Sequence, residues 1–268
     1  MNAGHALRLD ARTGRLTGPT GSMVPGLTQA NLAILPAAMA DDFARFLAAN
    51  PAPFPLLARG RAGDPHLPEL GRDIDLRTDL PRYRVFRNGR PAGDPTDIVD
   101  LWRDDLVAFA IGCSLSFEAA LVTGGVALRC HAPGLTCSAF DSALPLVPVG
   151  RFGGRMVVSM RAVRRDQVAR AQAISAAHPQ AHGAPVHVGD PAAIGVDVTR
   201  PIDGIGLTDI ATGEVPVFWA CGVSLERAIA HAAPDLAITH APGHMLVTDH
   251  PARAAEPEQT RPHVQHGE

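Results

Sequence analysis

Hydrophobic and polar positions along the chain predict strands that alternate with helices in its second half. Strands are expected at residues 155–161, 185–188, 215–219, 236–240 and 245–248, and helical segments at 163–177, 191–194 and 224–233. This alternation is typical of an α/β fold, here a mainly parallel sheet flanked by helices.

The first half of the chain is less regular. Helices are expected at residues 37–49, 96–111 and 116–123, and loop or extended chain at residues 1–35. Residues 82–86 alternate polar and apolar side chains and precede Asn88-Gly89, which favours a hairpin turn. We therefore expect a smaller α+β lobe somewhere within residues 65–150.

The length of 268 residues fits one catalytic unit over residues 1–250, made of two packed lobes. Residues 251–268 are polar and rich in Pro, Glu, Gln and His, which predicts a mobile tail. No apolar run reaches the roughly 20 residues that a membrane span needs. We expect a cytoplasmic protein without a membrane partner, and a homo-oligomer is compatible with the sequence.

The amino-acid composition disfavours or excludes several kinds of partner and cofactor. The formal net charge is −3, which disfavours a nucleic-acid partner. All 24 basic residues are Arg, so a pyridoxal phosphate (PLP) Schiff base and a Lys-containing phosphate loop for ATP are both excluded. An anion that is bound by a side-chain cation must therefore be bound by Arg, which suits carboxylates.

The four cysteines show no C-x-x-C spacing, so a structural zinc site is not expected, and a chain this large does not need disulfides. A divalent metal elsewhere remains open, and no cofactor is certain.

Three predicted strands end in Gly together with a reactive side chain. The candidate catalytic and binding residues at these ends are His187, Asp190, Cys221, Gly222, Val223, His240 and His244. Because ligands bind at the carboxyl ends of parallel strands, these ends should converge on one pocket. Cys221 precedes a predicted helix start, where a thiol pKa is lowered or an anion is bound.

Each of these residues also has an ordinary interpretation. His187 fits a half-buried histidine and Cys221 a small core residue. A loop metal site in which Asp190 joins His187, His240 or His244 is a further alternative.

A second group of candidates lies in the first half. Cys113 and Ser114 precede a predicted helix and form a candidate anion cradle, with Glu118 as a nearby acid or base. Arg77 and Arg82 are candidates for holding a substrate carboxylate, although a solvated Arg/Asp surface explains such a cluster equally well.

Sequence blocks along nearly the whole chain resemble a family of bacterial hydro-lyases with a D-glutamate cyclase relative in mammals. The matching blocks are QANLAILP at 29–36, RTDLPRYRV at 77–85, WRDDLVAF at 102–109, GCSLSFE at 112–118, VVSMR at 157–161, HGAPVHVGDP at 182–191, EVPVFWACGV at 214–223 and AITHAPGHMLVTD at 237–249.

The resemblance implies dehydration of a small acidic amino acid, as in the conversion of D-glutamate to 5-oxo-D-proline and water. One segment departs from the family pattern. Related sequences carry Tyr-Arg-Thr-Asn where this chain has Phe140-Asp141-Ser142-Ala143. If the family's Arg holds a substrate carboxylate, the specificity of this chain is changed.

For this reaction, Arg77 or Arg82 would hold the α-carboxylate, and His187 or His240 would deprotonate the ammonium. The N–H groups of Gly222 and Val223 would stabilise an oxyanion, and a thioester on Cys221 ranks lower. Two other classes stay open: a metal-assisted hydro-lyase on another amino or hydroxy acid, and a non-catalytic binding module for a small acidic metabolite.

Overall fold

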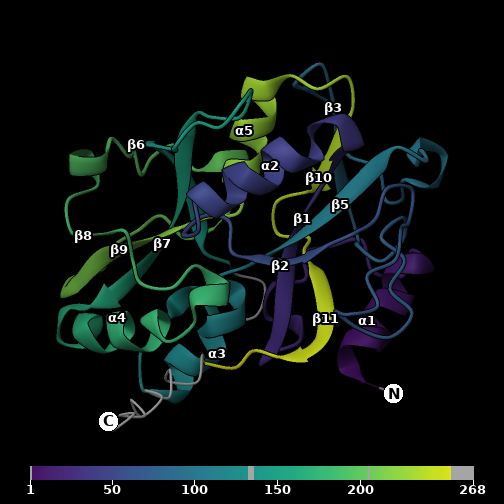
Figure 1. Ribbon diagram of the computed structural model, residues 1–268. Helices are drawn as coiled ribbons and strands as arrows, with labels where there is room; N and C mark the ends of the chain where they lie inside the picture. Colours follow the sequence, from purple (N-terminus) through teal and green to yellow (C-terminus); the bar gives the residue numbers. More distant parts are fainter. Residues whose placement is uncertain (1, 132–135, 205, 255–268) are drawn as a thin grey trace, which may run out of the picture.

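The computed structural model describes residues 2–131, 136–204 and 206–254 (Figure 1). The described α-helices are α1 (Ala3–Arg12), α2 (Ala37–Ala49), α3 (Leu115–Thr123), α4 (Val168–Ala176) and α5 (Ser224–Ala232). The described strands are β1 (Leu27–Pro36), β2 (Leu56–Arg59), β3 (Tyr83–Arg87), β4 (Arg90–Gly93), β5 (Leu106–Gly112), β6 (Ser138–Pro145), β7 (Arg155–Arg164), β8 (His187–Val188), β9 (Glu214–Ala220), β10 (Ala237–His240) and β11 (Leu246–Pro251). Of the predicted tail, residues 255–268 lie outside the described part, and Pro251 still belongs to β11.

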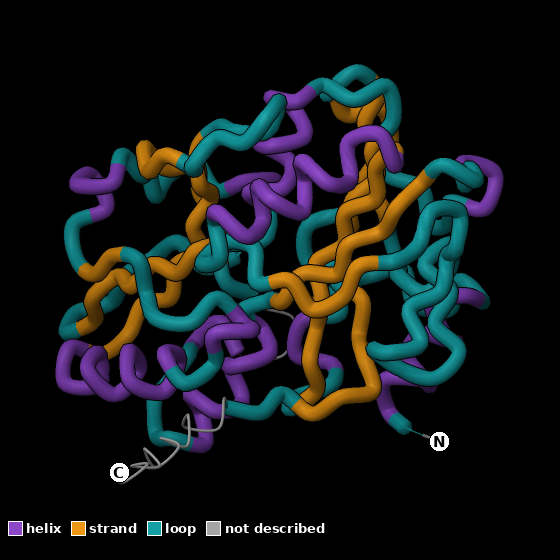
Figure 2. The backbone as a smooth tube through the Cα atoms, in the orientation of Figure 1, coloured by secondary structure: helices purple, strands orange, loops and turns teal. Residues whose placement is uncertain are grey.

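Two sheets organise this α/β fold, and Figure 2 shows them as two separate groups of strands. The larger sheet has the order β2-β5-β1-β10-β3-β4, with β11 also paired to β1, and the smaller has the order β6-β7-β9-β8. Among the described residues, every pairing between these strands is antiparallel. The predicted mainly parallel sheet is therefore wrong.

The connections explain the error. After β7 and α4 the chain enters β8, but β9 then inserts between β7 and β8 in the opposite direction. Helix α5 next carries the chain from the smaller sheet to β10 of the larger one, and it packs on both β7 and β10. The β7–α4–β8 connection is thus a crossover within the smaller sheet, but antiparallel β9 separates its two strands, and α5 then leads to the other sheet.

The strands β1 and β5 form the centre of the larger sheet and were not predicted. They pair from Ala30↔Gly112 to Pro36↔Leu106. Residues 106–112 are all buried. A central strand is buried on both of its faces, whereas an amphipathic helix exposes one face to solvent. The predicted helix at 96–111 is therefore wrong, and only a 3₁₀ turn at Val99–Leu101 remains of it.

Residues 1–35 were predicted as loop or extended chain, yet they begin with α1, which packs on β11. The fully buried Arg8 anchors this helix by donating to Val247 O at 2.7 Å and to Asp249 Oδ1 at 3.0 Å. These partners lie about 240 residues away in sequence, so local pattern alone does not reveal the helix.

Several predicted elements are confirmed. Helix α2 spans the predicted residues 37–49 and buries Phe43, Phe46 and Leu47 against one face of the larger sheet. Asn88 and Gly89 both have positive φ angles, 49° and 73°, and they connect β3 to β4 as a hairpin. No described helix combines the length and the apolarity that crossing a membrane requires.

Candidate functional site

A small pocket lies where β5, β9 and β10 end. We call it the strand-end pocket, and its polar lining includes Asn31, Cys113, Ser114, Ser159, Cys221 and His240. Its volume of about 60 Å³ is far below the roughly 300–1,000 Å³ of sites that enclose a whole small molecule. The pocket therefore suits a small group such as one carboxyl rather than a whole metabolite.

The convergence of these strand ends follows from the antiparallel order. Both β5 and β10 flank β1 and run opposite to it, so their carboxyl ends lie together beside the first half of β1. The end of β9 approaches from the smaller sheet. The helices α3 and α5 start directly after β5 and β9, which directs two helix N-termini towards the same place.

Asn31 joins the two sheets at this point. Its Nδ2 donates to Gly112 O at 2.6 Å, which fixes the end of β5. Its carboxamide also fills the space in which a Cβ on Gly222 would lie. Sequence reasoning did not nominate Asn31, although a buried amide inside the apolar strand LTQANLAILP is a usable signal.

His240 lies in the pocket wall as a neutral hydrogen-bond donor. Its Nδ1 accepts the backbone N–H of Leu32 at 3.2 Å, so the ring proton of the neutral form is on Nε2. Burial lowers the pKa of His240 to about 4. The predicted role as a base with a near-neutral pKa is therefore not supported, and a donor to a substrate oxygen fits better.

Acid should destabilise the fold through its buried imidazoles. Burial also lowers the pKa of His182 to about 4, with its Nδ1 2.8 Å from Ala52 O. Below about pH 6.5 the unfolded chain takes up a proton on each ring while the folded chain does not. Stability is therefore lost as the pH falls from 6.5 towards 4, by ~2 kcal/mol per ring between pH 7 and 5.

Urea unfolding at pH 7 and pH 5 measures this loss. We expect His182→Gln, which does not change the pocket lining, to show a smaller difference in unfolding free energy between the two pH values than the parent. An equal difference in both proteins would contradict the burial argument.

Two of the three cysteines that line the pocket, Cys113 and Cys221, have the same local setting. Cys113 and Cys221 each follow a strand and precede a helix. Burial raises the pKa of Cys113, and it raises the pKa of Cys221 to about 12, although the N–H groups of Leu115 and Val223 act against the shift. The expected lowering of the Cys221 pKa is thus outweighed by burial, and both groups remain neutral thiols near pH 7.

A buried ion pair between Arg161 and Glu118 contacts two residues of the pocket lining. Arg161 donates to Glu118 Oε1 through Nε at 2.9 Å and Nη2 at 2.7 Å. The same guanidinium donates to Ser114 Oγ at 3.0 Å and Ser159 Oγ at 3.2 Å. Glu118, predicted as an acid or base, does not line the pocket, and its position indicates that it orients Arg161.

His187 and Asp190 do not join the pocket. Because β8 runs antiparallel to β9, its carboxyl end points away from Cys221. His187 instead packs on the ring of Phe218 at 5.9 Å, and its Nε2 lies 2.8 Å from Asp190 O. Within the described residues no group of three or more His, Cys, Asp or Glu is arranged to hold a metal ion, so the proposed loop metal set is not assembled.

Three further candidates also lie outside the pocket lining. His244 contacts Pro242 O through Nδ1 at 2.9 Å. Arg77 forms a bidentate pair with Asp75 at 2.9 and 2.7 Å, and Arg82 donates to Asp94 O at 3.3 Å. Neither arginine faces the pocket or the cleft beside it.

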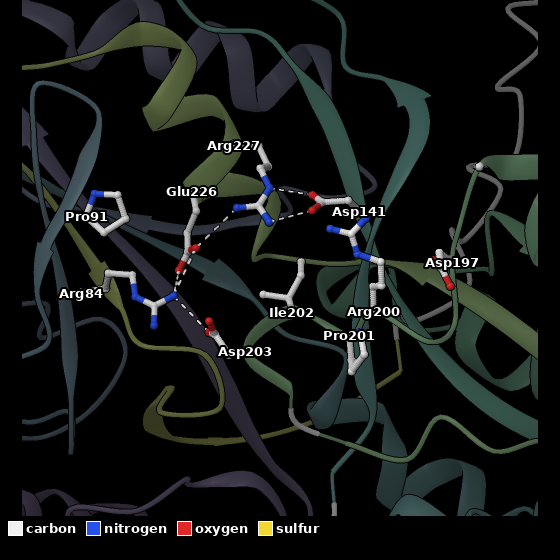
Figure 3. Close-up of a pocket in the computed structure, with 11 residues that line it drawn as sticks. Arg84, Pro91, Asp141, Asp197, Arg200, Pro201, Ile202, Asp203, Glu226 and Arg227 are labelled. Atoms are coloured by element: carbon white, nitrogen blue, oxygen red, sulfur yellow. Dashed lines mark hydrogen bonds and ion pairs between the residues drawn. The ribbon is translucent and has the colours of Figure 1, made fainter.

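The departure from the family pattern lies in β6, next to the pocket. Ala139 lines the strand-end pocket, and Asp141, two residues further along the same strand, lines a larger neighbouring cleft. Ile202 borders both spaces (Figure 3). Sequence reasoning missed the cleft residues Arg84 and Glu226, since only the tertiary fold brings β3 and α5 together.

Comparison with known proteins identifies the family of this chain. Residues 107–249 match the family model described as D-glutamate cyclase, and this span contains most of the pocket lining. Proteins named "Putative hydro-lyase" from Bordetella petrii, Jannaschia sp. and Rhizobium johnstonii are 54%, 51% and 50% identical to the chain. These alignments cover 90%, 91% and 93% of this chain and 92%, 92% and 93% of the relatives.

Among solved structures, a nitrogen repressor-like protein from Methanococcus jannaschii matches with a TM-score of 0.40 and 10% identity, over 92% of this chain and 95% of that one. That likeness supports no functional comparison. The family model and the three relatives, each of which extends over most of the chain, show that the protein belongs to the hydro-lyase family that includes the D-glutamate cyclase domain.

Proposed function

We propose that the protein is a hydro-lyase that acts on a small acidic amino acid, in a D-glutamate cyclase-like dehydration to 5-oxo-D-proline. The strand-end pocket holds the side-chain carboxyl that loses its oxygen. The observation that carries this proposal is the convergence of two helix N-termini and the neutral donor His240 on one small pocket.

The chemistry of the reaction requires such a pocket. When an amine attacks a carboxyl carbon, negative charge develops on the carboxyl oxygen. Fixed donors that already point at this oxygen stabilise the transition state without reorganisation. The positive ends of the α3 and α5 helix dipoles and the Nε2–H of His240 provide fixed polar groups of this kind. The N–H groups of Ser116, Phe117, Ser224 and Leu225 themselves donate to carbonyls of the turn before each helix.

Incubation of metal-stripped protein with D-glutamate tests the proposal. We expect 5-oxo-D-proline to form, and the reverse reaction from 5-oxo-D-proline to be detectable. Parallel assays with L-glutamate and with added divalent metal separate stereochemistry and metal dependence. No product from either stereoisomer, with or without metal, would reject the proposal.

Cys221→Ser should keep most of the turnover, within about threefold of the parent. A thioester route needs a thiolate, and a pKa of about 12 leaves very little thiolate near neutral pH. Steady-state kinetics checks this, with circular dichroism as the folding control. A loss of 100-fold or more in a folded variant would instead favour a covalent role for the thiol.

A further inference from the structure

A cleft of about 560 Å³ opens beside the strand-end pocket and shares Ile202 with it (Figure 3). This volume lies in the range of small-molecule sites. Among the described residues, those of β3, β4, β6, α5 and the segment 195–203 line the cleft. A ligand that occupies the cleft lies next to the pocket in which we place the reacting carboxyl.

Two arginines in the cleft have matching arrangements. Arg84 donates through Nε and Nη2 to Asp94 at 3.1 and 3.0 Å. Arg227 donates through the same two atoms to Asp141 at 2.6 and 3.0 Å. Each bidentate pair fixes the plane of its guanidinium and leaves Nη1 for other partners. Arg84 Nη1 already donates to Asp203 Oδ2 at 3.1 Å.

Both Nη1 atoms approach one carboxyl group, that of Glu226. Arg84 Nη1 lies 3.2 Å from Glu226 Oε1, and Arg227 Nη1 lies 3.8 Å from Oε2. Figure 3 shows Glu226 between the two arginines. Its side chain is only 7% exposed, although it lines the cleft.

Neighbouring groups have opposing effects on the pKa of Glu226. Burial raises its pKa to about 7, while Arg84 on β3 and Arg227 on α5 lower it and Asp203 on the 3₁₀ turn at 202–204 raises it. Such a group accepts a proton readily near neutral pH. Once neutral, Glu226 no longer competes with another carboxylate for the two Nη1 atoms, and a bound carboxylate then shares Arg84 Nη1 with Asp203.

A zwitterionic amino acid supplies both groups that this arrangement fits. We propose that the cleft binds the amino-acid end of a dicarboxylic amino acid, with Arg84 and Arg227 holding the α-carboxylate and Glu226 accepting a proton from the ammonium. This assignment rests on the function proposed above and extends it to the residues that select the substrate. Asp141 then positions Arg227 and is not itself a ligand for the substrate.

The proton balance of the step is complete. The ammonium nitrogen loses two protons, the first of them to Glu226, and its lone pair forms the bond to the side-chain carboxyl carbon. The departing oxygen takes up both protons and leaves as water. Glu226 is ionised again at the end, and no oxidant or other co-reactant is required.

Titration calorimetry with D-glutamate and D-2-hydroxyglutarate tests the assignment, because the second probe keeps both carboxylates and lacks the ammonium. The parent should bind D-glutamate at least tenfold more tightly. Glu226→Gln, which is isosteric, should lose this preference and reduce kcat at least 100-fold at every pH between 6 and 8. Asp141→Asn should weaken the binding of both probes to a similar extent, about tenfold, because Arg227 is no longer fixed.

Asp166→Asn is the matched control, since the Arg164–Asp166 pair is exposed and lies at the far end of β7, outside the cleft and the pocket. This substitution should leave the affinity for both probes unchanged. If Glu226→Gln keeps the preference for the amine and the parental kcat, or if the parent binds neither probe, the assignment is wrong.

The same measurements separate the two proposals. Binding of D-glutamate with the amine preference, but without formation of 5-oxo-D-proline, would support the cleft assignment and reject the dehydration. Formation of 5-oxo-D-proline at the parental rate by Glu226→Gln would support the dehydration and reject the cleft assignment.

Discussion

Glu118→Gln is expected to lower the free energy of unfolding by about 3–5 kcal/mol, the range for breaking one partner of a buried ion pair. The Arg161 side chain is 0% exposed and that of Glu118 is 5% exposed. Water therefore cannot solvate the guanidinium once the carboxylate charge is removed. The guanidinium also lies over the rings of Phe117 and Trp219, at 5.2 and 5.3 Å, which prevents it from turning to solvent.

Chemical denaturation of the parent and the variant measures this difference. The Asp166→Asn control breaks an Arg–carboxylate pair at the end of the same strand, in which the side chains are 60% and 65% exposed, and it should leave stability unchanged. Equal effects of the two substitutions would show that Arg161 does not depend on Glu118. We also expect Glu118→Gln to reduce turnover, because Arg161 holds both Ser114 and Ser159 at the pocket.

Local sequence pattern predicted those elements whose determinants are local. The spacing of Phe43, Phe46 and Leu47 defines α2, and Asn88-Gly89 defines the β3–β4 turn because both residues adopt positive φ. The central strands were not predicted, since β5 is apolar on both faces and such a run fits a buried helix equally well.

The candidate site was likewise predicted only in part. Cys221, Val223 and His240 lie together as expected, and Cys113 and Ser114, which were predicted as a separate group, join them. The reason differs from the predicted one. They meet because β5 and β10 both run opposite to β1, and the same antiparallel rule places His187 and Asp190 elsewhere.

Asn31 and Arg161 were missed because their importance comes from partners far away in sequence. Asn31 bonds to Gly112, 81 residues away, and Arg161 bonds to Glu118, 43 residues away. Each is nevertheless a polar residue within an apolar strand. A buried polar residue needs a partner, so such positions are candidates for site-building residues even when the partner is unknown.

Gly222→Ala is expected to reduce kcat/KM at least 100-fold, the scale of effect of a displacement of about 1 Å at a reacting centre. A Cβ at this position would overlap the carboxamide of Asn31, which contacts Gly222 directly. Either Asn31 releases Gly112 O or the start of α5 moves away from the pocket. The overpacking should also cost about 1–3 kcal/mol of stability.

Gly18→Ala is the matched control, because nothing lies within 4 Å of a Cβ there and its φ is not positive. It should leave kcat/KM unchanged, whereas parental activity in Gly222→Ala would contradict the proposed role of this contact.

The double variant Asn31→Ala/Gly222→Ala distinguishes crowding from loss of the hydrogen bond. Removal of the carboxamide makes room for the new methyl group, so the two substitutions should destabilise the protein by less than the sum of their separate effects. Activity should stay low in the double variant, because the end of β5 has lost the bond from Asn31 Nδ2 to Gly112 O. Recovery of activity together with stability would mean that the site needs only the space between the two sheets and not the amide that joins them.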